Sequence, residues 1–480
     1  MATTTATRTA LAFSRAHNPT RTLWTAATCS HPDLATALSR CLLPSSSSSS
    51  PSSAPPTTQS KDSVTIVLAS RSYPGSDLLS LPSKIPASIA QSSFILGAVV
   101  DRIPTKSGHG VSTLTLTPDT SSSSSSSSSD RRLIACEPFY LSGAESRRKR
   151  LKEKSVGKWA RSQDIEERSL DTADAWSAFK SISISRNQVQ IPNAARPSSA
   201  STTPSSEQDI VMISDLEVHQ FLEALDVANP EASKIGVLAS STPFITGRPV
   251  TMFYDGKVVQ DGVVGVSVVK EVKKKAGESD DGKSKTFVEY PSLAPLGPAM
   301  QITRCRGNII LELDESNATR LLLDRLQTTT LTKDKEYFLA TGEPTDAKAD
   351  QQAVDVDMTK ATVYKITGGD PSKGNMAVDT VHDLSVGQWV QFIHHDSNLE
   401  QGHYEPSSNS GNQGLLRFTT TDPNNTLEES EELNGQHKQE GADSVQTVFG
   451  GSSENGFVVG QPNGQTWVCT VTDSIVKHRL

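Results

Sequence analysis

The segment from Asp209 to Val269 shows the clearest succession of apolar and polar patterns in the chain. Ile210 to Ile213 is a short β-branched run, which predicts a buried strand. A second apolar run, Ile235 to Ala239, predicts another strand. Between the two runs, apolar residues recur at the spacing of one helix face, namely Val218, Phe221, Leu222 and Leu225. The predicted order is strand, helix, strand, polar loop and hairpin.

The predicted helix has recognisable ends. Ser214-Asp-Leu-Glu217 has the spacing of a capping box, in which a hydroxyl and a later carboxylate satisfy free amides. Asn229-Pro230 ends the helix, because proline disfavours helical backbone at the preceding residue. After the polar turn 240–243, strands are predicted at Val250–Tyr254 and Val263–Val269, with a turn at Asp255-Gly256.

A similar order occurs earlier in the chain. Val64–Ser70, Phe94–Val100 and Gly110–Thr117 are predicted strands, and VTIVLAS, FILGAVVDRIP and GVSTLTLT align in order with DIVMISD, KIGVLASSTP and VTMFYDG. The second strand of each half has a central glycine, Gly97 or Gly236. A repeated supersecondary unit indicates an internal duplication, although common patterning without common ancestry gives the same order.

The C-terminal half shows a different pattern. Gln301–Leu313 is predicted as one long strand, because its apolar and polar residues alternate. A helix stripe follows, formed by Ala318, Leu321, Leu322 and Leu326. The core face of the long strand would carry Thr303, Cys305, Ile309, Leu311 and Leu313. Later strands are predicted at Thr362–Ile366, Val378–Val381, Gly387–Ile393, Phe457–Val459 and Trp467–Val471.

Composition limits the folded part of the chain. Only 35% of the 480 residues are apolar, and serine homopolymers such as Ser45–Ser50 and Ser121–Ser129 cannot bury a core. We therefore expect 1–60 to be disordered, containing a linker and a possible targeting segment. A module over 61–269 and another over 286–480 follow. The predicted disordered insertions lie near 119–131, 192–208, 341–357 and 398–446.

Charge and cysteine usage exclude several classes. A net charge of −8 argues against nucleic-acid or membrane-surface binding, and no apolar stretch is long enough for a membrane span. The basic cluster Arg147–Arg150 is either a localisation or nucleic-acid patch or a solvated face. Five cysteines without a CxxC pair indicate a reducing compartment rather than a zinc site or a disulfide framework.

The N-terminal region has the composition of a mitochondrial transit peptide, because arginines and hydroxyl residues are frequent and the single acid is Asp33. Two alternatives remain. The region could be an ordinary disordered terminus of a cytoplasmic protein, or His31–Leu43 could be the first helix of the folded part.

Three segments together resemble the FIST-domain family (F-box and intracellular signal transduction), and its fungal members in particular. They are SKIGVLASSTPFITGRPVTMFYDGKVVQDGVVGVSVV, ITRCRGNIILELDESNATRLLLDRL and GGDPSKGNMAVDTVHDLSVGQWVQFIHHD. The resemblance covers 62–118, 209–396 and 448–480. It implies an α+β fold of two β-rich mixed modules, N-terminal and C-terminal FIST-like, with helices packed on the sheets. It also implies a sensory domain that binds small ligands such as amino acids. The chain departs from the family in having Glu315 where glycine is usual and in lacking a recognisable F-box.

Catalytic and metal sites are not evident. Cys305, between two arginines, could be an activated thiolate, but strand alternation places those arginines on the opposite face, which favours an inert thiol. His394-His395-Asp396 with His403 lacks metal-ligand spacing. No cofactor motif and no catalytic residues are predicted.

Ligand-binding residues are expected in the loops that follow strands, because rigid strands position exposed polar groups there. An arginine among hydroxyls and backbone amides could hold a carboxylate. In the alternative interpretation these residues only cap turns and form surface ion pairs. The candidates are Ser240, Ser241, Thr242, Arg248, Asp101, Arg102, Arg304 and Asn308.

The leading hypothesis is a non-catalytic small-ligand sensor of FIST type, with an amino acid as the candidate ligand. Two alternatives belong to other classes: a hydrolase or transferase with an unidentified site, and a scaffold that binds protein partners through its serine-rich and acidic tracts. A ligand that stabilises the native state without turnover would favour the sensor.

Overall fold

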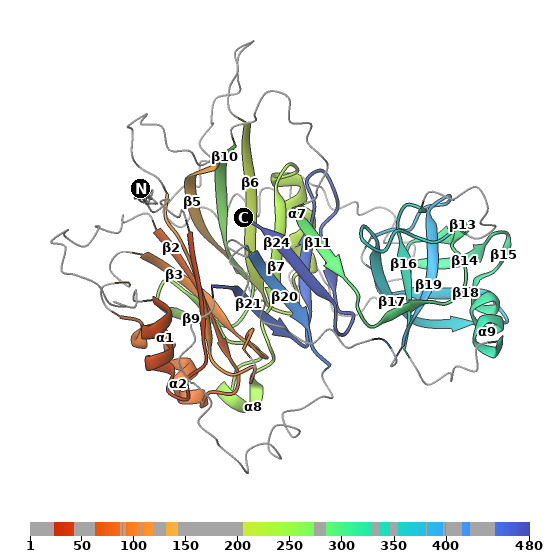
Figure 1. The fold of residues 1–480 in the computed structure, drawn as a ribbon. Coiled ribbons are helices and arrows are strands. Elements are labelled where there is room, and N and C mark those ends of the chain that lie inside the picture. Colours follow the sequence, from red (N-terminus) through yellow and green to blue (C-terminus); the bar gives the residue numbers. More distant parts are fainter. Residues whose placement is uncertain are drawn as a thin grey trace, which may run out of the picture.

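The computed structural model describes a strand-rich chain with few helices, arranged as three open sheets and a separate barrel (Figure 1). This confirms the predicted β-rich character and the mixed sheets. The described residues are 24–42, 63–86, 89, 93–105, 107–118, 131–142, 205–272, 285–328, 336–345, 354–380, 382–396, 399, 415–422 and 447–480.

The first sheet contains most of the N-terminal strands. Its central strands, β2 and β3, are parallel, and β4 pairs with β2 in the antiparallel sense. Short helices α1 (Leu34–Leu42), α2 (Gly75–Leu79), α3 (Leu81–Lys84) and α8 (Pro243–Thr246) accompany it. The order is β1 (Trp24–Cys29), β4 (Val111–Leu116), β2 (Ser63–Ser70), β3 (Ser93–Val100), β8 (Met252–Tyr254) and β9 (Lys257–Val259).

The second and third sheets repeat this core arrangement. In the second sheet, β6 and β7 are parallel and β10 pairs antiparallel with β6. In the third sheet, β20 and β21 are parallel and β24 pairs antiparallel with β20. Helix α7 (His219–Ala228) connects β6 to β7. The second order is β23 (Trp467–Cys469), β22 (Phe457–Gly460), β7 (Ser233–Leu238), β6 (Ser205–Ser214), β10 (Val263–Val272) and β5 (Arg131–Leu141). The third order is β11 (Thr286–Glu289), β24 (Ile475–Arg479), β20 (Leu415–Thr420) and β21 (Phe449–Ser453).

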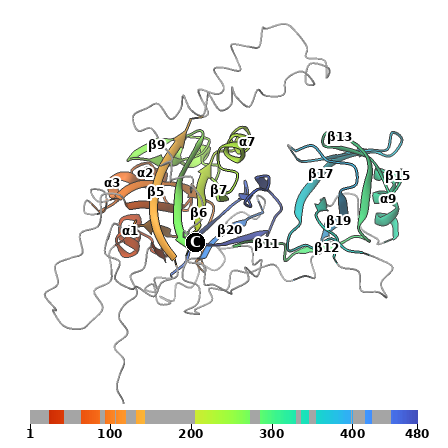
Figure 2. The ribbon, with the colours of Figure 1, turned by 90° about the horizontal axis from the view of Figure 1, so that it is seen from above.

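The barrel is built from residues between β11 and β20. Its strands close on themselves because β19 pairs with both β13 and β16. Figures 1 and 2 show it beside the three sheets, reached through β11. Helix α9 (Ala318–Thr328) lies on it. The strands are β12 (Leu293–Pro295), β13 (Met300–Arg306), β14 (Ile309–Leu313), β15 (Ser316–Asn317), β16 (Tyr337–Thr341), β17 (Thr362–Asp370), β18 (Asn375–Val378) and β19 (Trp389–His395).

A glycine marks the same register position in each of the three parallel pairs. Gly97, Gly236 and Gly450 lie opposite Val67, Met212 and Arg417, respectively. A Cβ atom at these glycines would be 1.9, 2.3 and 2.0 Å from the carbonyl oxygen of the opposite residue. Only glycine allows this close approach. We call the segments 24–118, 131–272 and 415–480, each of which contains one parallel pair, the first, second and third units. The three units therefore share one local constraint.

The three units form a closed ring through backbone hydrogen bonds between equivalent positions. Val99 of the first unit donates its N–H to Thr251 O of the second at 2.9 Å. Leu238 of the second donates to Gly456 O of the third at 3.0 Å, and Ser452 of the third donates to Arg102 O of the first at 2.8 Å. The hairpin β8–β9 of the second unit extends the first sheet, and β22–β23 of the third extends the second.

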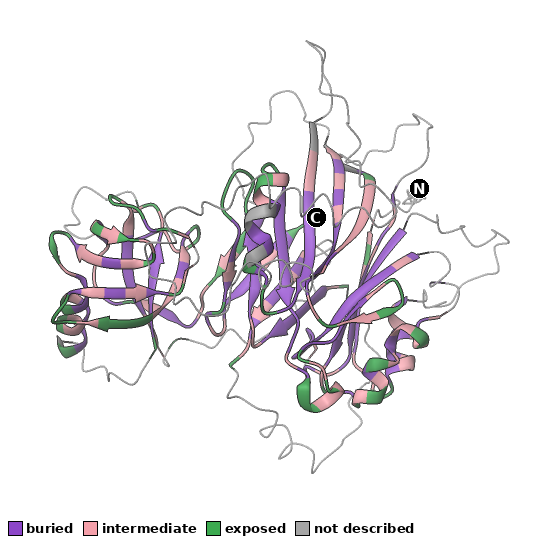
Figure 3. Ribbon diagram, turned by 180° about the vertical axis from the view of Figure 1, so that it is seen from behind, coloured by how far each residue is buried: buried purple, intermediate pink, exposed green. Residues whose placement is uncertain are grey.

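A shared interior joins the three sheets and one side of the barrel. Buried apolar residues from the first, second and third sheets, such as Leu68, Val237 and Phe418, belong to one cluster. That cluster continues to Phe338 and Ile393 of the barrel. Figure 3 shows the buried residues concentrated in the strands.

Several predictions about local structure were wrong. Helix α7 begins after Val218 without a side-chain cap, and Ser214 ends strand β6 instead. Asp215 replaces the expected capping box by accepting from Glu217 N at 2.9 Å and Gly262 N at 2.7 Å. The strand before Asp255-Gly256 pairs with β9 and β3, so the predicted equivalence of VTMFYDG and GVSTLTLT does not hold.

The predicted long strand 301–313 is a hairpin. Gly307, with φ of 59°, turns the chain between β13 and β14, and the turn resets the alternation of faces. Ile302, Ile310 and Leu313 are therefore the buried residues. Leu313 lies in the core as predicted, whereas Thr303, Cys305, Ile309 and Leu311 are only half-buried. Two segments expected to be disordered also contain elements: β1 and α1 lie within 1–60, and β20 lies within 398–446.

Candidate functional site

The carboxyl ends of β3, β7 and β21 meet at one place, which we call the polar centre. Asp101, Ser240 and Glu454 occupy equivalent positions there, four residues after Gly97, Gly236 and Gly450. Asp101 and Ser240 are buried, and the Glu454 side chain is 10% exposed. The backbone ties the ends together, because Asp101 N donates to Ser452 O at 2.9 Å and Ser240 N donates to Val99 O at 3.0 Å.

Arg71, immediately after β2, connects two of these positions. Its Nε lies 2.8 Å from Asp101 Oδ1, and its Nη1 lies 3.6 Å from Glu454 Oε1. Arg102 adds a second guanidinium, with Nε 3.7 Å from Asp101 Oδ2. The side chains of Arg71 and Arg102 are 20% and 37% exposed, so the centre reaches solvent on the arginine side. Two carboxylates and two guanidiniums therefore share a largely buried space.

Hydrogen-bonding capacity in the polar centre is only partly used. Glu454 Oε1 accepts from Ser241 N at 2.7 Å, and Asn455 Nδ2 donates to Ala239 O at 2.9 Å. Within the described part of the chain, Ser240 Oγ and Glu454 Oε2 are buried and have no hydrogen-bond partner. Asp101 Oδ1 has the ion pair with Arg71 but no aligned hydrogen bond there. Buried polar atoms normally have partners, so these oxygens have accepting capacity that no described residue uses.

The electrostatics of the centre reflect burial and opposing charges. Burial raises the pKa of Asp101 above its ordinary range, and the neighbouring Glu454 raises it further, while Arg71 and Arg102 oppose the shift. A cation placed beside Asp101 and Glu454 would remove this penalty. The centre can thus bind a positive group on its carboxylate side and a negative group on its arginine side.

The predicted site residues are divided between four places. Asp101, Arg102, Ser240 and Ser241 come together in the polar centre. Thr242 lies behind it, where its hydroxyl is 2.8 Å from that of Thr251. The remaining three lie elsewhere: Arg248 is at the end of the α8 turn and donates to Gln260, whereas Arg304 and Asn308 are exposed on the barrel, where Arg304 pairs with Glu312 at 3.0 Å.

Sequence reasoning missed Arg71, Glu454 and Asn455. The signal for the last two was the glycine of the FGGSSENG run, which is equivalent to Gly97 and Gly236 but lies among small polar residues. Cys305 is half-buried, its thiol donates to Leu384 O at 3.1 Å, and burial raises its pKa, so it is not activated. His394 and His395 bond the backbone of His395 and the Ser292 hydroxyl, respectively, and His403 lies outside the described residues.

Comparisons with known proteins add one finding. The family model described as FIST N domain matches residues 156–316, which include Ser240 and Ser241 but not Arg71, Asp101 or Glu454. No curated protein and no solved structure matches the chain. Among the described helices, none is long and apolar enough for a bilayer crossing. The FIST N domain indicates a sensory module of signal transduction. Residues 156–316 of the chain are therefore similar to the FIST N domain.

Proposed function

We propose that this protein is a non-catalytic sensor that binds a small zwitterionic ligand of the amino-acid class in the polar centre. The single observation that carries the proposal is the convergence of Asp101, Ser240 and Glu454, whose side chains each hold a buried oxygen without a hydrogen bond among the described residues. A purely structural role does not require Ser240 Oγ and Glu454 Oε2 to lack hydrogen-bond partners among the described residues, since each such buried atom costs free energy.

The charges of the centre match the two ends of an amino acid. We place the α-ammonium group, which has three donors, against Glu454 Oε2, because no described donor binds that oxygen. An α-carboxylate fits the partly exposed guanidiniums of Arg71 and Arg102. The Ser240 hydroxyl supplies a neutral contact. Charge-assisted hydrogen bonds at both ends would select zwitterions over simple amines or acids.

The position of the centre also provides a route to signalling. Asp101 belongs to the first unit of the ring, Ser240 to the second and Glu454 to the third. A ligand that contacts all three would stabilise the closed ring relative to any state in which one unit has moved away. Binding energy is thereby converted into a change of population among arrangements of the three units.

A thermal-shift screen of the full chain against the common amino acids tests the proposal. A ligand present at one hundred times its Kd stabilises the native state by about 2.7 kcal/mol, which gives a measurable rise in Tm. We expect at least one amino acid to raise the Tm and to be recovered unchanged. E454Q and R71Q should abolish the shift, whereas R304Q, on the exposed barrel arginine, should retain it. A panel without any shift, or a shift that survives both centre variants, would overturn the proposal.

We further propose that the two FIST-like modules correspond to residues 61–269 and 286–480. The first would contain two of the ring units, and the second would contain the barrel and the third unit. We also propose mitochondrial targeting by the arginine-rich N-terminus. A fluorescent fusion of residues 1–60 that remains diffuse in the cytosol would refute that targeting.

A further inference from the structure

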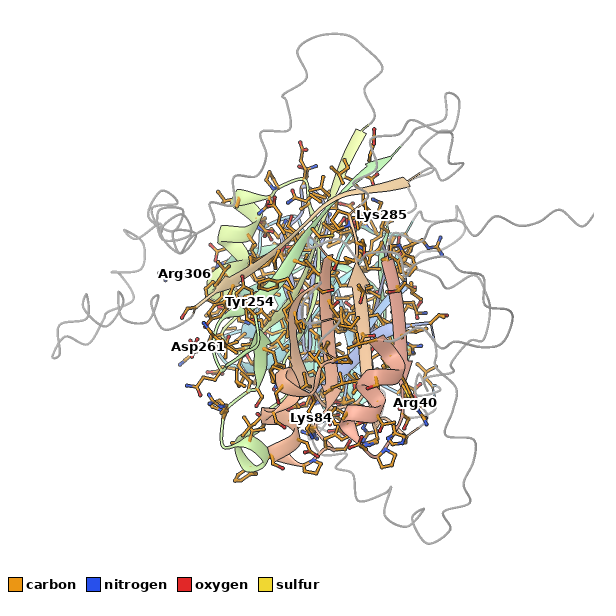
Figure 4. The ribbon with its side chains drawn as sticks, turned by 90° about the vertical axis from the view of Figure 1, so that its left-hand side faces the viewer. Arg40, Lys84, Tyr254, Asp261, Lys285 and Arg306 are labelled. Carbon is orange, nitrogen blue, oxygen red and sulfur yellow. The ribbon has the colours of Figure 1, made fainter. Side chains whose placement is uncertain are left out.

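Two cysteines lie together at the outer edge of the first sheet, away from the polar centre. Cys29 is the last residue of β1, and Cys41 is in the last turn of α1, which packs on β1. Val111 is the strand partner of Cys29, and the Cys41 thiol lies 3.6 Å from Val111 O. Both cysteines therefore lie at Val111, where each affects the pKa of the other. Figure 4 shows the neighbouring Arg40 on α1 beside the strands.

The surroundings of the pair distinguish it from the other cysteines. The hydrogen bond from Cys41, together with the charges of Arg40 and His31, lowers the pKa of Cys29 to about 6, although burial opposes the shift. The same hydrogen bond and burial raise the pKa of Cys41. Burial raises the pKa of Cys136 and of Cys469 to about 12 and also raises that of Cys305. One thiolate beside one thiol is the arrangement that a dithiol oxidation requires.

A chain of hydrogen bonds leads from this pair toward the polar centre. His31, two residues after Cys29, accepts at its carbonyl from Tyr73 OH at 2.7 Å, and His109 Nε2 lies 3.0 Å from the same oxygen. His109 Nδ1 bonds the Ser72 hydroxyl, which is 2.8 Å from the Ser70 hydroxyl. Ser70 Oγ donates to Asp101 O at 3.2 Å. These bonds connect the β1–α1 loop to Asp101 of the polar centre.

We propose that Cys29 and Cys41 form a reversible disulfide in response to hydroperoxides. The Cys29 thiolate attacks one peroxide oxygen, the O–O bond breaks, and hydroxide leaves, so that Cys29 becomes a sulfenic acid. The Cys41 sulfur then attacks the Cys29 sulfur, the S–S bond forms, and the S–O bond breaks. The proton of Cys41 and the hydroxyl of the sulfenic acid leave as water. Both thiols are oxidised by two electrons in total, and the peroxide is reduced to two waters.

The oxidant for this pair must be small, because Cys29 is only 1% exposed and Cys41 is only partly exposed. Hydrogen peroxide meets this requirement. The full chain is treated with increasing hydrogen peroxide, quenched in acid, alkylated under denaturing conditions and digested with trypsin. Cleavage after Arg21, Arg40 and Lys61 separates the two cysteines into the peptides 22–40 and 41–61. We expect a linked pair of these peptides with a mass two hydrogens below their sum, and its loss after treatment with dithiothreitol.

Two variants test whether the linked peptides arise from the Cys29–Cys41 disulfide. C41S should abolish the linked peptides and leave Cys29 as a sulfenic acid that dimedone traps, whereas C305S should leave the linked pair unchanged. Recovery of both peptides as alkylated thiols under conditions that oxidise Cys305 would overturn the proposal. Oxidation of Cys29 to sulfinic acid in the wild type without any linked pair would overturn it as well.

The link to the polar centre has its own readout, which does not depend on any ligand. Amide hydrogen exchange is compared between the reduced and the oxidised chain, with peroxide-treated C41S as the control for oxidation elsewhere. We expect exchange to change in peptides covering Ser70–Tyr73 and Asp101–His109, and to remain unchanged in the barrel. An oxidised chain whose exchange differs only within β1 and α1 would confine the disulfide to a local role and refute the coupling.

Discussion

Replacement of Lys270 by methionine tests how the second and third sheets are held together. Lys270 of β10 pairs with Asp209 of β6, and His478 Nε2 of β24 lies 3.4 Å from the same carboxylate. The Thr286 hydroxyl is 2.8 Å from His478 Nδ1. Asp209 and His478 have no exposed surface, and Lys270 is 5% exposed. K270M therefore removes one of the two basic side chains that neighbour this buried carboxylate.

The magnitude follows from the alternatives open to Asp209. An unpaired buried carboxylate costs several kcal/mol, so the group takes up a proton instead. Protonation at about pH 7 of a carboxyl whose ordinary pKa is 3.8 costs about 4 kcal/mol, which is the scale of the expected loss. We expect K270M to lower the free energy of unfolding by about 3–4 kcal/mol. Urea denaturation followed by circular dichroism measures it.

A neighbouring surface pair provides the control. Lys477 of β24 lies 2.7 Å from Glu289 of β11, and both side chains are substantially exposed. K477M should cost at most about 1 kcal/mol, because exposed ion pairs contribute little. A K270M loss below about 1 kcal/mol, equal to that of the control, would refute the reasoning.

The pH dependence of the same variant gives an independent check. Burial alone would raise the pKa of Asp209, but His478 and Lys270 outweigh it and hold the pKa below 3.8 in the wild type. The wild type therefore keeps this contribution above pH 3.8 and loses it as the pH falls through the lowered pKa. In K270M the pKa is raised, so acid relieves the penalty. The difference between the two proteins should shrink as the pH falls from about 7 to 5, and a constant difference would contradict the assignment.

Three further predictions concern the ring and the barrel. G236A should lower the free energy of unfolding in urea titrations by about 1–3 kcal/mol, because its Cβ would lie 2.3 Å from Met212 O. The control G368A, whose Cβ meets nothing within 4 Å, should leave the free energy of unfolding nearly unchanged. Equal losses in the two variants would contradict the shared constraint. W467A should lower the free energy of unfolding by about 3–5 kcal/mol in the same assay, because Trp467 is 8% exposed and packs on Tyr364 of the barrel. The control F244A removes a fully exposed side chain and should leave the free energy of unfolding almost unchanged. Burial lowers the pKa of His109, so the unfolded state binds the proton more tightly than the folded state. Stability should therefore fall as the pH drops below about 6.5, by at most about 1.4 kcal/mol per pH unit. H109Q should flatten this slope in pH-dependent melting, and an unchanged slope would exclude His109 as its source.

The sequence was sufficient for the strands whose apolar runs are short and β-branched. Val64–Ser70 and Ile210–Ile213 were identified as strands, and the equivalence of Gly97 and Gly236 located the close approach in two units. Pairing was not predictable in the same way, because periodicity reports burial and not the partner strand. The third unit was missed since the barrel separates it from the second and its strand β21 consists largely of glycine and serine.

In the candidate site, only the residues that follow strands with a strong apolar pattern were predictable. Asp101 and Ser240 follow strands with strong apolar patterns, so their polar loops were recognised as candidates. Glu454 follows a strand without such a pattern, and its proximity to Arg71 depends on the closure of the ring. Arg304 is exposed, as the strand alternation predicted, but the pattern does not show that its strand belongs to the barrel and not to the sheets that form the polar centre.

The exchange of hairpins between units has a consequence for synthesis on the ribosome. The edge of β3 can be covered once β8 has emerged, but the edge of β7 remains open until Phe457–Gly460 has been made. The barrel strands are translated during that interval, and the pairings of the described barrel strands are with one another. An open strand edge is a template for wrong partners, so the nascent chain is most vulnerable to aggregation while the barrel is being translated.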